Sequence, residues 1–464
     1  GLLVLYFPIV FFRKVFLSNK FVYSRSEKLL VFSAAFLLTW ELVTYNYNYY
    51  LDSAFYFDRF LLIILTVLLL RFPLLTPLYI AFAFVYRSQF NYPVAGFELY
   101  DKRLLFDILI LFISYRYLKG FLSDFKISFP WLVLCMVAAN YFYTGIAKII
   151  ISPHGYEWLT QNNLANLFLN VHLRGWMANV DEIGITSIWN FLNKWHVPLQ
   201  LLVLSTELSA LFLLKSKRLS IIILIASFFM HLCIFYCGSM LFWKWMAIDA
   251  LLIYILVKDK SIAEEFEQKK AFILSIIIIF SAFIWLRPFM IGWYDTPANQ
   301  YFTYEVEDVK GVTYQFEKNE MNPYHQWFQY DHFLFLIDKP CLPVTGFGYT
   351  NKYKLFSEIK NSSPGELLEL EQKKGTNYFD SLKTSAYYDF IKTYFSNRNK
   401  LLNNGLIFTA FRAPHHLHNS SQGLVYKNQS PVAKFKVIYN LSLSSTAKTA
   451  HVYKTTIHEI SIPE

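Results

Sequence analysis

The fold is decided by an apolar segment that still contains a charged residue near its end, Ala138-Ala139-Asn140-Tyr141-Phe142-Tyr143-Thr144-Gly145-Ile146-Ala147-Lys148-Ile149-Ile150. Tyr141, Gly145 and Lys148 recur at i, i+4 and i+7, so they share one face of a helix, and the glycine leaves room beside the amine. An ionisable side chain at membrane depth is costly and is read by default as a functional group. Lys148 is therefore the first candidate for a site.

The composition of the chain is too apolar for an ordinary soluble protein of its length. Of 464 residues, 55% are hydrophobic and 19% aromatic, and the mean hydropathy is +0.32. These values predict an integral membrane protein, with the lipid bilayer as its main partner. The net charge of +10 does not indicate nucleic-acid binding, because most cations of the first 290 residues fall in short loops between apolar segments, where they set topology.

The apolar segments predict an α-helical polytopic membrane protein with about nine transmembrane helices. We place the helices at residues 28–47, 57–71, 73–87, 102–118, 128–150, 196–214, 219–237, 240–257 and 271–292. With nine spans, the loop cations collect on one side, which puts the N-terminus in the cytoplasm and everything after about residue 293 outside. Residues 1–20, whose apolar run is broken by Pro8, Arg13, Lys14 and Lys20, are expected to form an interfacial helix.

We expect two domains, a membrane domain at residues 1–293 and an extracytoplasmic, β-rich α+β domain at residues 294–464. The membrane domain includes a long outside loop at 151–195, whose aromatic and apolar residues predict short helices lying on the membrane surface: Trp158, Leu159, Leu164, Leu167, Phe168, Val171 and Trp176. In the second domain, alternating polar and apolar residues at 303–309 and 434–439 predict strands. A stretch rich in Leu, Glu and Lys at 353–402 predicts helix.

Cysteine and histidine residues give no metal signature. Cys135, Cys233, Cys237 and Cys341 have no paired spacing typical of a metal knuckle or a disulfide framework. The run Pro414-His415-His416-Leu417-His418 lies in a predicted loop without a cysteine or carboxylate ligand nearby in sequence. No metal is expected.

Six ionisable groups fall inside the predicted spans and are biased toward the outer leaflet: Asp107, Lys148, Glu207, His231, Lys244 and Asp249. This bias predicts a polar cavity open to the outside. A lysine in such a cavity loses hydration, which disfavours its charged form and makes a neutral, proton-accepting amine plausible, so Lys148 is the candidate general base. The alternatives for Lys148 are snorkelling to the interface and pairing with a carboxylate for packing.

Two further groups of this set also have alternative readings. His231 is expected to orient a substrate or relay a proton, or else to be a hydrogen-bonded structural histidine. Lys244, in Phe242-Trp243-Lys244-Trp245, is a substrate-site candidate or an interfacial anchor.

The pattern aromatic-Phe-x-x-Gly-x-x-Lys at 141–148, followed by Trp158 in a loop, resembles the vitamin K-dependent γ-carboxylase superfamily, whose bacterial branch is called the horizontally transferred transmembrane (HTTM) domain. His231, followed by Gly238 and the aromatic run 242–245, is a second match. The resemblance covers about residues 20–320 and implies a lipid-soluble quinol such as vitamin K hydroquinone, with Lys148 as its base and His231 as an orienting group. Arg87-Ser88-Gln89-Phe90-Asn91-Tyr92 offers an asparagine but no histidine where true carboxylases carry Asn-Asn-His, so superfamily membership is better supported than carboxylation of glutamate.

The sequence therefore predicts a carboxylase-like, quinol-dependent membrane enzyme. Its expected substrate-site residues besides Lys148 and His231 are Tyr141, Gly145, Trp158, Asn91, Asp107, Glu207 and Lys244. The alternative is a non-enzymatic membrane subunit whose outside domain at 294–464 docks a partner protein and whose cavity holds a structural lipid. A transporter is less favoured, because the sequence has no paired broken helices and no internal symmetry.

Overall fold

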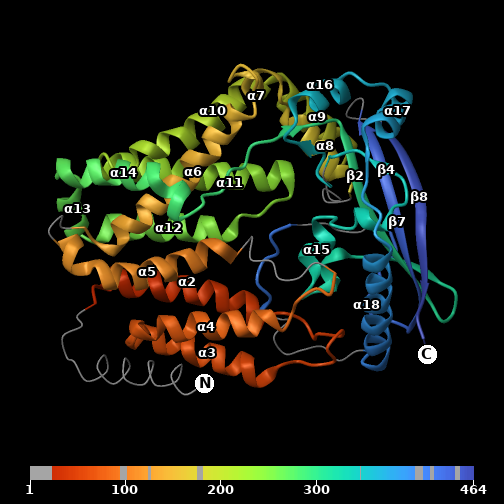
Figure 1. Ribbon diagram of the computed structural model, residues 1–464, viewed down its shortest axis with the longest axis horizontal. Helices are drawn as coiled ribbons and strands as arrows, with labels where there is room; N and C mark the ends of the chain where they lie inside the picture. The colour runs from red at the N-terminus through yellow and green to blue at the C-terminus, as the bar shows by residue number, and fades with distance from the viewer. Residues whose placement is uncertain are drawn as a thin grey trace.

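The computed structural model describes residues 23–94, 102–123, 127–174, 181–344, 346–402, 411–417, 423–444 and 450–463. The interfacial helix expected at 1–20, and the residues Trp176 and His418, lie outside these ranges. Helices that run side by side form one part of the molecule, and a sheet with its own helices forms the other (Figure 1).

Within the described residues, an α-helix covers most of each of the nine predicted apolar segments. They are α2 (Arg25–Val43), α3 (Tyr56–Arg71), α4 (Thr76–Ser88), α5 (Arg103–Ser123), α6 (Phe129–Ile150), α10 (His196–Ser209), α11 (Lys217–Gly238), α12 (Trp243–Lys258) and α14 (Lys269–Trp285). By length and composition, α6 and α11 are the two among the described helices that suffice to cross a membrane, and His196–Phe212 is a shorter apolar helix. The largely helical class with a sheet part is confirmed, while a crossing by all nine helices stays a prediction.

The starts of several helices follow from serine caps in the sequence. The Ser24 hydroxyl accepts from the backbone amide of Glu27, whose carboxylate accepts in return from the Ser24 amide, so α2 begins with a capping box. Ser128 caps α6 and is followed by Pro130 in the first turn, where a missing amide hydrogen costs nothing. Ser216 caps α11 in the same way.

Helix α6 lies at the centre of the helical part. Its residues from Phe129 to Phe142 are all buried, and it packs against α10, α14, α5, α2 and α12. The outward faces of other helices instead carry large exposed apolar side chains: Phe57, Phe60, Val67 and Leu70 on α3, Ile222, Phe229 and Tyr236 on α11, and Ile273, Ile277, Phe280 and Ile284 on α14. Apolar surface of this extent on several helices is typical of contact with lipid.

The loop predicted at 151–195 forms short helices, α7 (Glu157–Gln161), α8 (Leu164–Leu173) and α9 (Glu182–Lys194). Trp158, Leu167, Phe168 and Val171 are all buried within the protein, so these four side chains do not face lipid. The location of the short helices on the membrane surface stays a prediction. Leu167 and Val171 pack in a cluster with Met240, Phe347 and Leu417. The apolar stripe of α8 is thus covered by other parts of the chain.

The sheet part begins where the composition changes. Strands β2 (Ala298–Asp308), β3 (Thr313–Phe316), β7 (Val432–Ser444) and β8 (Ala450–Ser461) form a four-stranded antiparallel sheet in the order β3-β2-β7-β8. Short strands β1 (Tyr294–Asp295) and β5 (Tyr349–Thr350) pair separately, as do β4 (Pro340–Cys341) and β6 (Thr376–Asn377). The predicted helical stretch contains α16 (Tyr353–Lys360), α17 (Pro364–Lys374) and α18 (Ser381–Lys400), and α15 (His325–Gln329) precedes it.

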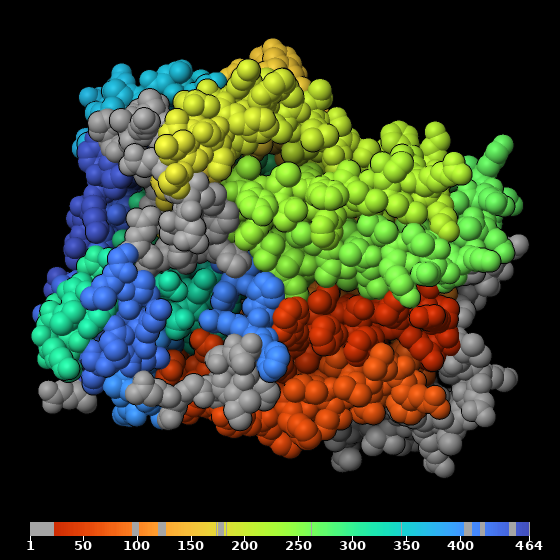
Figure 2. All heavy atoms as spheres, turned by 180° about the vertical axis from the view of Figure 1, so that it is seen from behind, coloured from red at the N-terminus to blue at the C-terminus, as the bar shows by residue number. Residues whose placement is uncertain are grey.

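Alternation along the strands gives this sheet one apolar and one charged face. Phe302, Tyr304 and Val306 of β2 are buried in one cluster with residues of β7 and α18. Glu305, between Tyr304 and Val306, points to the other face. Glu307 lies on the same face as Glu305 and pairs with Lys434 and Lys436 of β7. From behind, the late, blue part of the chain lies beside the orange and green helices (Figure 2).

The segment 286–293, between α14 and β1, crosses the C-terminal half of α6. The Phe289 amide donates to Asn140 Oδ1 at 3.0 Å, and the Thr144 hydroxyl donates to the Phe289 carbonyl at 3.0 Å. A Cβ added to Gly292 would lie 2.7 Å from the carbonyl oxygen of Ala147, so only glycine permits this approach. The segment is thereby held against the helix that carries Lys148.

Candidate ligand cavity

A cavity of about 480 Å³ lies between α6, α10, α11, the start of α12 and the segment 286–293. Most of its lining is apolar or aromatic. Of the nine predicted catalytic and substrate-site residues, six line it: Tyr141, Lys148, Trp158, Glu207, His231 and Lys244. A chamber of this size with few polar groups is typical of a site for a small apolar ligand.

Exposed apolar side chains of α10 and α11 form part of the cavity wall. Leu202 of α10 and Phe229 of α11 both line it, and they are 64% and 57% exposed. Both side chains are apolar, and α11 is one of the helices whose outward face carries large exposed apolar side chains.

Lys148 forms a buried ion pair on the wall of this cavity. Its Nζ lies 2.6 and 2.8 Å from the two carboxylate oxygens of Glu207 and 3.2 Å from the Ile291 carbonyl oxygen. Its ammonium group also lies 5.3 Å from the ring centroid of Trp158. Lys148 thus pairs with a carboxylate, one of the two alternatives to its role as a base. It does not extend its amine toward an interface, which was the other alternative.

Gly145 makes this pair possible but does not itself line the cavity. A Cβ at this position would lie 3.0 Å from Leu208 Cδ2 and 3.2 Å from Glu207 Cβ. The room predicted beside the amine is therefore filled by α10, whose close approach brings Glu207 to Lys148. Gly145 therefore serves helix packing and does not contact a ligand in the cavity.

Tyr141, Asp249 and His231 form a second polar group. The Tyr141 hydroxyl donates to Asp249 Oδ2 at 2.7 Å. His231 Nδ1 lies 4.0 Å from the same oxygen and makes no hydrogen bond, and the His231 ring stacks on Phe242 at 5.0 Å between centroids. His231 therefore has no structural hydrogen bond at Nδ1.

Lys244 is buried, so it does not lie at an interface as an anchor would. Its Nζ lies 2.6 Å from Glu41 Oε2, and Lys102 Nζ lies 2.7 Å from Glu41 Oε1. All three side chains are less than a tenth exposed. Sequence reasoning missed Glu41, although a carboxylate inside the apolar segment 28–47 was a signal for it.

Two predicted site residues lie away from the cavity lining. Asn91 is exposed just beyond the end of α4. Asp107 Oδ2 lies 3.4 Å from Arg103 Nε, one turn earlier on α5. The structure therefore brings neither of them to Lys148.

Asp295, which sequence reasoning also missed, lines the cavity. Its Oδ2 accepts from Asn162 Nδ2 at 2.9 Å, and its Oδ1 accepts from Trp293 Nε1 at 3.2 Å. Burial raises the pKa of this carboxyl to about 7. Its signal in the sequence was weak, because it stands after the last apolar segment.

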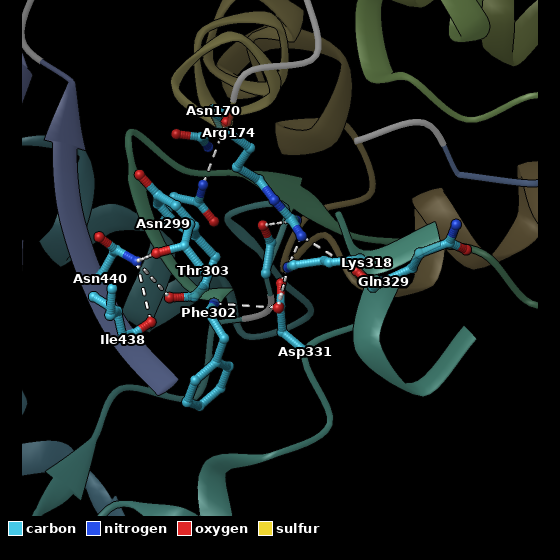
Figure 3. Close-up of polar contacts among 12 residues, drawn as sticks. Asn170, Arg174, Asn299, Phe302, Thr303, Lys318, Gln329, Asp331, Ile438 and Asn440 are labelled. Carbon is cyan, nitrogen blue, oxygen red and sulfur yellow. Dashed lines mark hydrogen bonds and ion pairs between the residues drawn. The ribbon is translucent and has the colours of Figure 1, made fainter. Parts of the chain in front are cut away.

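Another buried charge cluster, outside the cavity lining, joins the end of α8 to the sheet part (Figure 3). Asp331 Oδ2 accepts from Arg174 at 2.6 Å, while Oδ1 pairs with Lys318 and accepts from the Phe302 amide at 3.2 Å. Burial lowers the pKa of Lys318 to about 7, and the nearby Arg174 guanidinium adds to the effect. One carboxylate thus serves two buried cations.

The described residues contain no group of three or more His, Cys, Asp or Glu side chains arranged to hold a metal ion. His415 and His325 are neighbours, with ring centroids 4.8 Å apart, but the third histidine of the tract, His418, is outside the described ranges.

No known protein family, curated protein or solved structure matches this chain.

Proposed function

We propose that this chain is a γ-carboxylase-like integral membrane protein whose cavity binds a lipid-soluble quinol and whose Lys148–Glu207 pair takes up a proton from the quinol hydroxyl. The observation that carries the proposal is a buried lysine–carboxylate pair, 2.6 Å apart, on the wall of an otherwise largely apolar cavity. Vitamin K hydroquinone is the candidate cofactor that the resemblance implies. Carboxylation of glutamate is not part of the proposal.

In the proposed topology all nine apolar helices cross the bilayer. The N-terminus is cytoplasmic, and the sheet part is extracytoplasmic. The exposed apolar faces of α3, α11 and α14 support this arrangement, because lipid is the solvent in which such faces are stable. The quinol then enters from the bilayer between Leu202 and Phe229.

The pair is suited to proton uptake because it is neutral overall. When the proton shared between Lys148 and Glu207 rests on the carboxyl, the amine has a lone pair and can accept the hydroxyl proton of a quinol. The products are an ammonium beside a carboxylic acid and a quinolate, so the new positive and negative charges lie next to each other. In a cavity of low dielectric that proximity stabilises both charges.

A second candidate function is favoured by the hydrogen bonding of Lys148. The three donors of its ammonium match three acceptors, the two oxygens of Glu207 and the Ile291 carbonyl. A lysine satisfied in this way also suits a non-enzymatic membrane subunit, in which the cavity holds a structural lipid and residues 294–464 dock a partner protein.

The decisive variant replaces the whole pair, Lys148→Met with Glu207→Leu. Removing one partner alone strands a buried charge, whereas two apolar side chains of similar size are often neutral for stability. The full chain in nanodiscs is given vitamin K hydroquinone in oxygenated buffer, and conversion is followed by absorbance. We expect turnover to fall by roughly 100-fold or more, the usual contribution of a general base.

Lys194→Met is the matched control, because Lys194 is exposed at the end of α9. Turnover that survives in the double variant at wild-type level would refute the proposal. If wild-type protein converts no quinol, and mass spectrometry finds a bound phospholipid and a stoichiometric protein partner, the membrane-subunit function holds instead.

A further inference from the structure

We infer that Tyr141 and Asp249 position His231 as a second hydrogen-bonding group of the cavity, so that the site selects an aromatic ring with two hydroxyls at opposite ends. The inference rests on the proposed function and extends it. Lys148 and Glu207 serve one hydroxyl, and His231 serves the other.

The two polar ends are separated along α6. Tyr141 and Lys148 are seven residues apart on this helix, which at a rise of ~1.5 Å per residue is about 10 Å. The His231 ring lies beside the Tyr141 ring, with centroids 5.7 Å apart, and both His231 and Lys148 line the same cavity. One end of the site is therefore at Lys148, and the other lies beside Tyr141, whose backbone position is about 10 Å from that of Lys148 along the helix axis.

Asp249 is the group that can set the tautomer of His231. It is fully buried, and Tyr141 already donates to its Oδ2, while Oδ1 has no hydrogen-bond partner. His231 Nδ1 is 4.0 Å from Oδ2, so a shift of about 1 Å closes a hydrogen bond. A proton held on Nδ1 toward the carboxylate leaves Nε2 as an acceptor.

The ring of Phe242 also restrains one face of the His231 ring. It stacks on Phe242 at 5.0 Å with an interplanar angle of 26°. Tyr141 and Asp249 are thus positioning residues, and His231 is the group that touches the ligand.

The distance between the two ends defines the class of ligand. A lipid with a single polar head uses one end and leaves the other unsatisfied, which costs free energy in a cavity of this kind. A ring with para hydroxyls spans the gap with one hydrogen bond of ~2.8 Å at each end. The wall between them is aromatic, with Trp245 and Phe289 in contact at 6.0 Å between centroids.

The test compares tetramethylhydroquinone with its monomethyl ether, under argon, on the full chain in nanodiscs. The hydroquinone is symmetric, so the ether differs by one hydrogen-bond donor and one methyl group. Affinity is measured by quenching of tryptophan fluorescence. We expect wild-type protein to bind the hydroquinone roughly five- to tenfold more tightly, the value of one net hydrogen bond.

Asp249→Asn is expected to abolish this preference while binding of the ether stays unchanged, because the amide favours the wrong tautomer of His231. Tyr141→Phe keeps the ring contacts and removes only the hydroxyl, so it serves if Asp249→Asn does not fold, and it is expected to reduce the preference. His231→Gln, which keeps an acceptor, restores part of it relative to His231→Leu. The matched control is Asp107→Asn, a carboxyl of another helix that lies away from the cavity lining.

Equal binding of both compounds by wild-type protein would overturn this inference and leave the proposed function intact. A preference that persists in Asp249→Asn and Tyr141→Phe would overturn the positioning role. Binding of neither compound would overturn the proposed function itself, together with the inference.

Discussion

Replacing Lys318 with methionine is expected to remove a pH dependence of stability from the sheet part of the protein. In the folded chain Lys318 is buried beside Asp331, whose other carboxylate oxygen pairs with Arg174, and the pKa of Lys318 falls from the usual 10.5 to about 7. The unfolded chain therefore binds one more proton than the folded chain between these two pH values. Folding is favoured as that proton is released, so wild-type stability rises with pH in this window.

The size of the effect follows from the shift. Each pH unit within the window is worth about 1.4 kcal/mol, so the free energy of unfolding of wild-type protein should gain about 3 kcal/mol between pH 7 and pH 9 relative to Lys318→Met. Below pH 7 the buried ammonium is a cost that the variant avoids. Asp331 keeps its pairing with Arg174 and with the Phe302 amide in the variant, so no carboxylate is stranded.

The measurement is urea denaturation of the full chain in detergent at several pH values, read by pulse proteolysis of the sheet part. Lys310→Met is the control, because Lys310 is an exposed lysine of the same part. The reasoning is refuted if the wild-type and Lys318→Met curves stay parallel from pH 6 to pH 9. If Lys318→Met is the more stable protein at pH 9, its advantage over wild type should grow as the pH falls. A variant advantage that shrinks as the pH falls would have the wrong sign.

Two further predictions concern the helices. Gly145→Leu should push α10 away from α6, lower the free energy of unfolding by about 1–3 kcal/mol, as overpacking usually does, and abolish quinol turnover. The control is Gly365→Leu, because an added Cβ at Gly365 meets nothing within 4 Å. Thermal unfolding measures the stability of both variants. Cysteines placed at Lys215 and at Lys434 should react with a membrane-impermeant maleimide from opposite sides of the membrane, and labelling of both from one side would contradict the proposed topology.

The helices were predictable because the information for them is local. Apolar length and loop cations locate the nine segments, and the serine caps fix several starts. The strands at 303–309 and 434–439 were predictable from alternation for the same reason. The short helices in the loop at 151–195 were also predicted. The burial of their apolar side chains under other parts of the chain was not, because an apolar stripe on a short helix looks the same in the sequence whether lipid or protein covers it.

The partners of the charged groups could not be read from the sequence. Lys148 stands out inside its segment, yet its carboxylate is 59 positions further on and its third acceptor is the backbone of Ile291. Glu41 and Asp295 also reach their partners across the chain. Such pairings depend on which helices pack together, and periodicity within one segment does not contain that information.

The segment 286–293 connects the sheet part directly to Lys148. Its carbonyl at Ile291 is one of three acceptors of the amine, and three residues later the chain enters β1, which is paired with β5. A protein that bound the sheet part and shifted β1 would therefore change the energy of the charge on Lys148 without entering the cavity. By linkage, a ligand that altered that charge would change the affinity of the distant partner by the same factor.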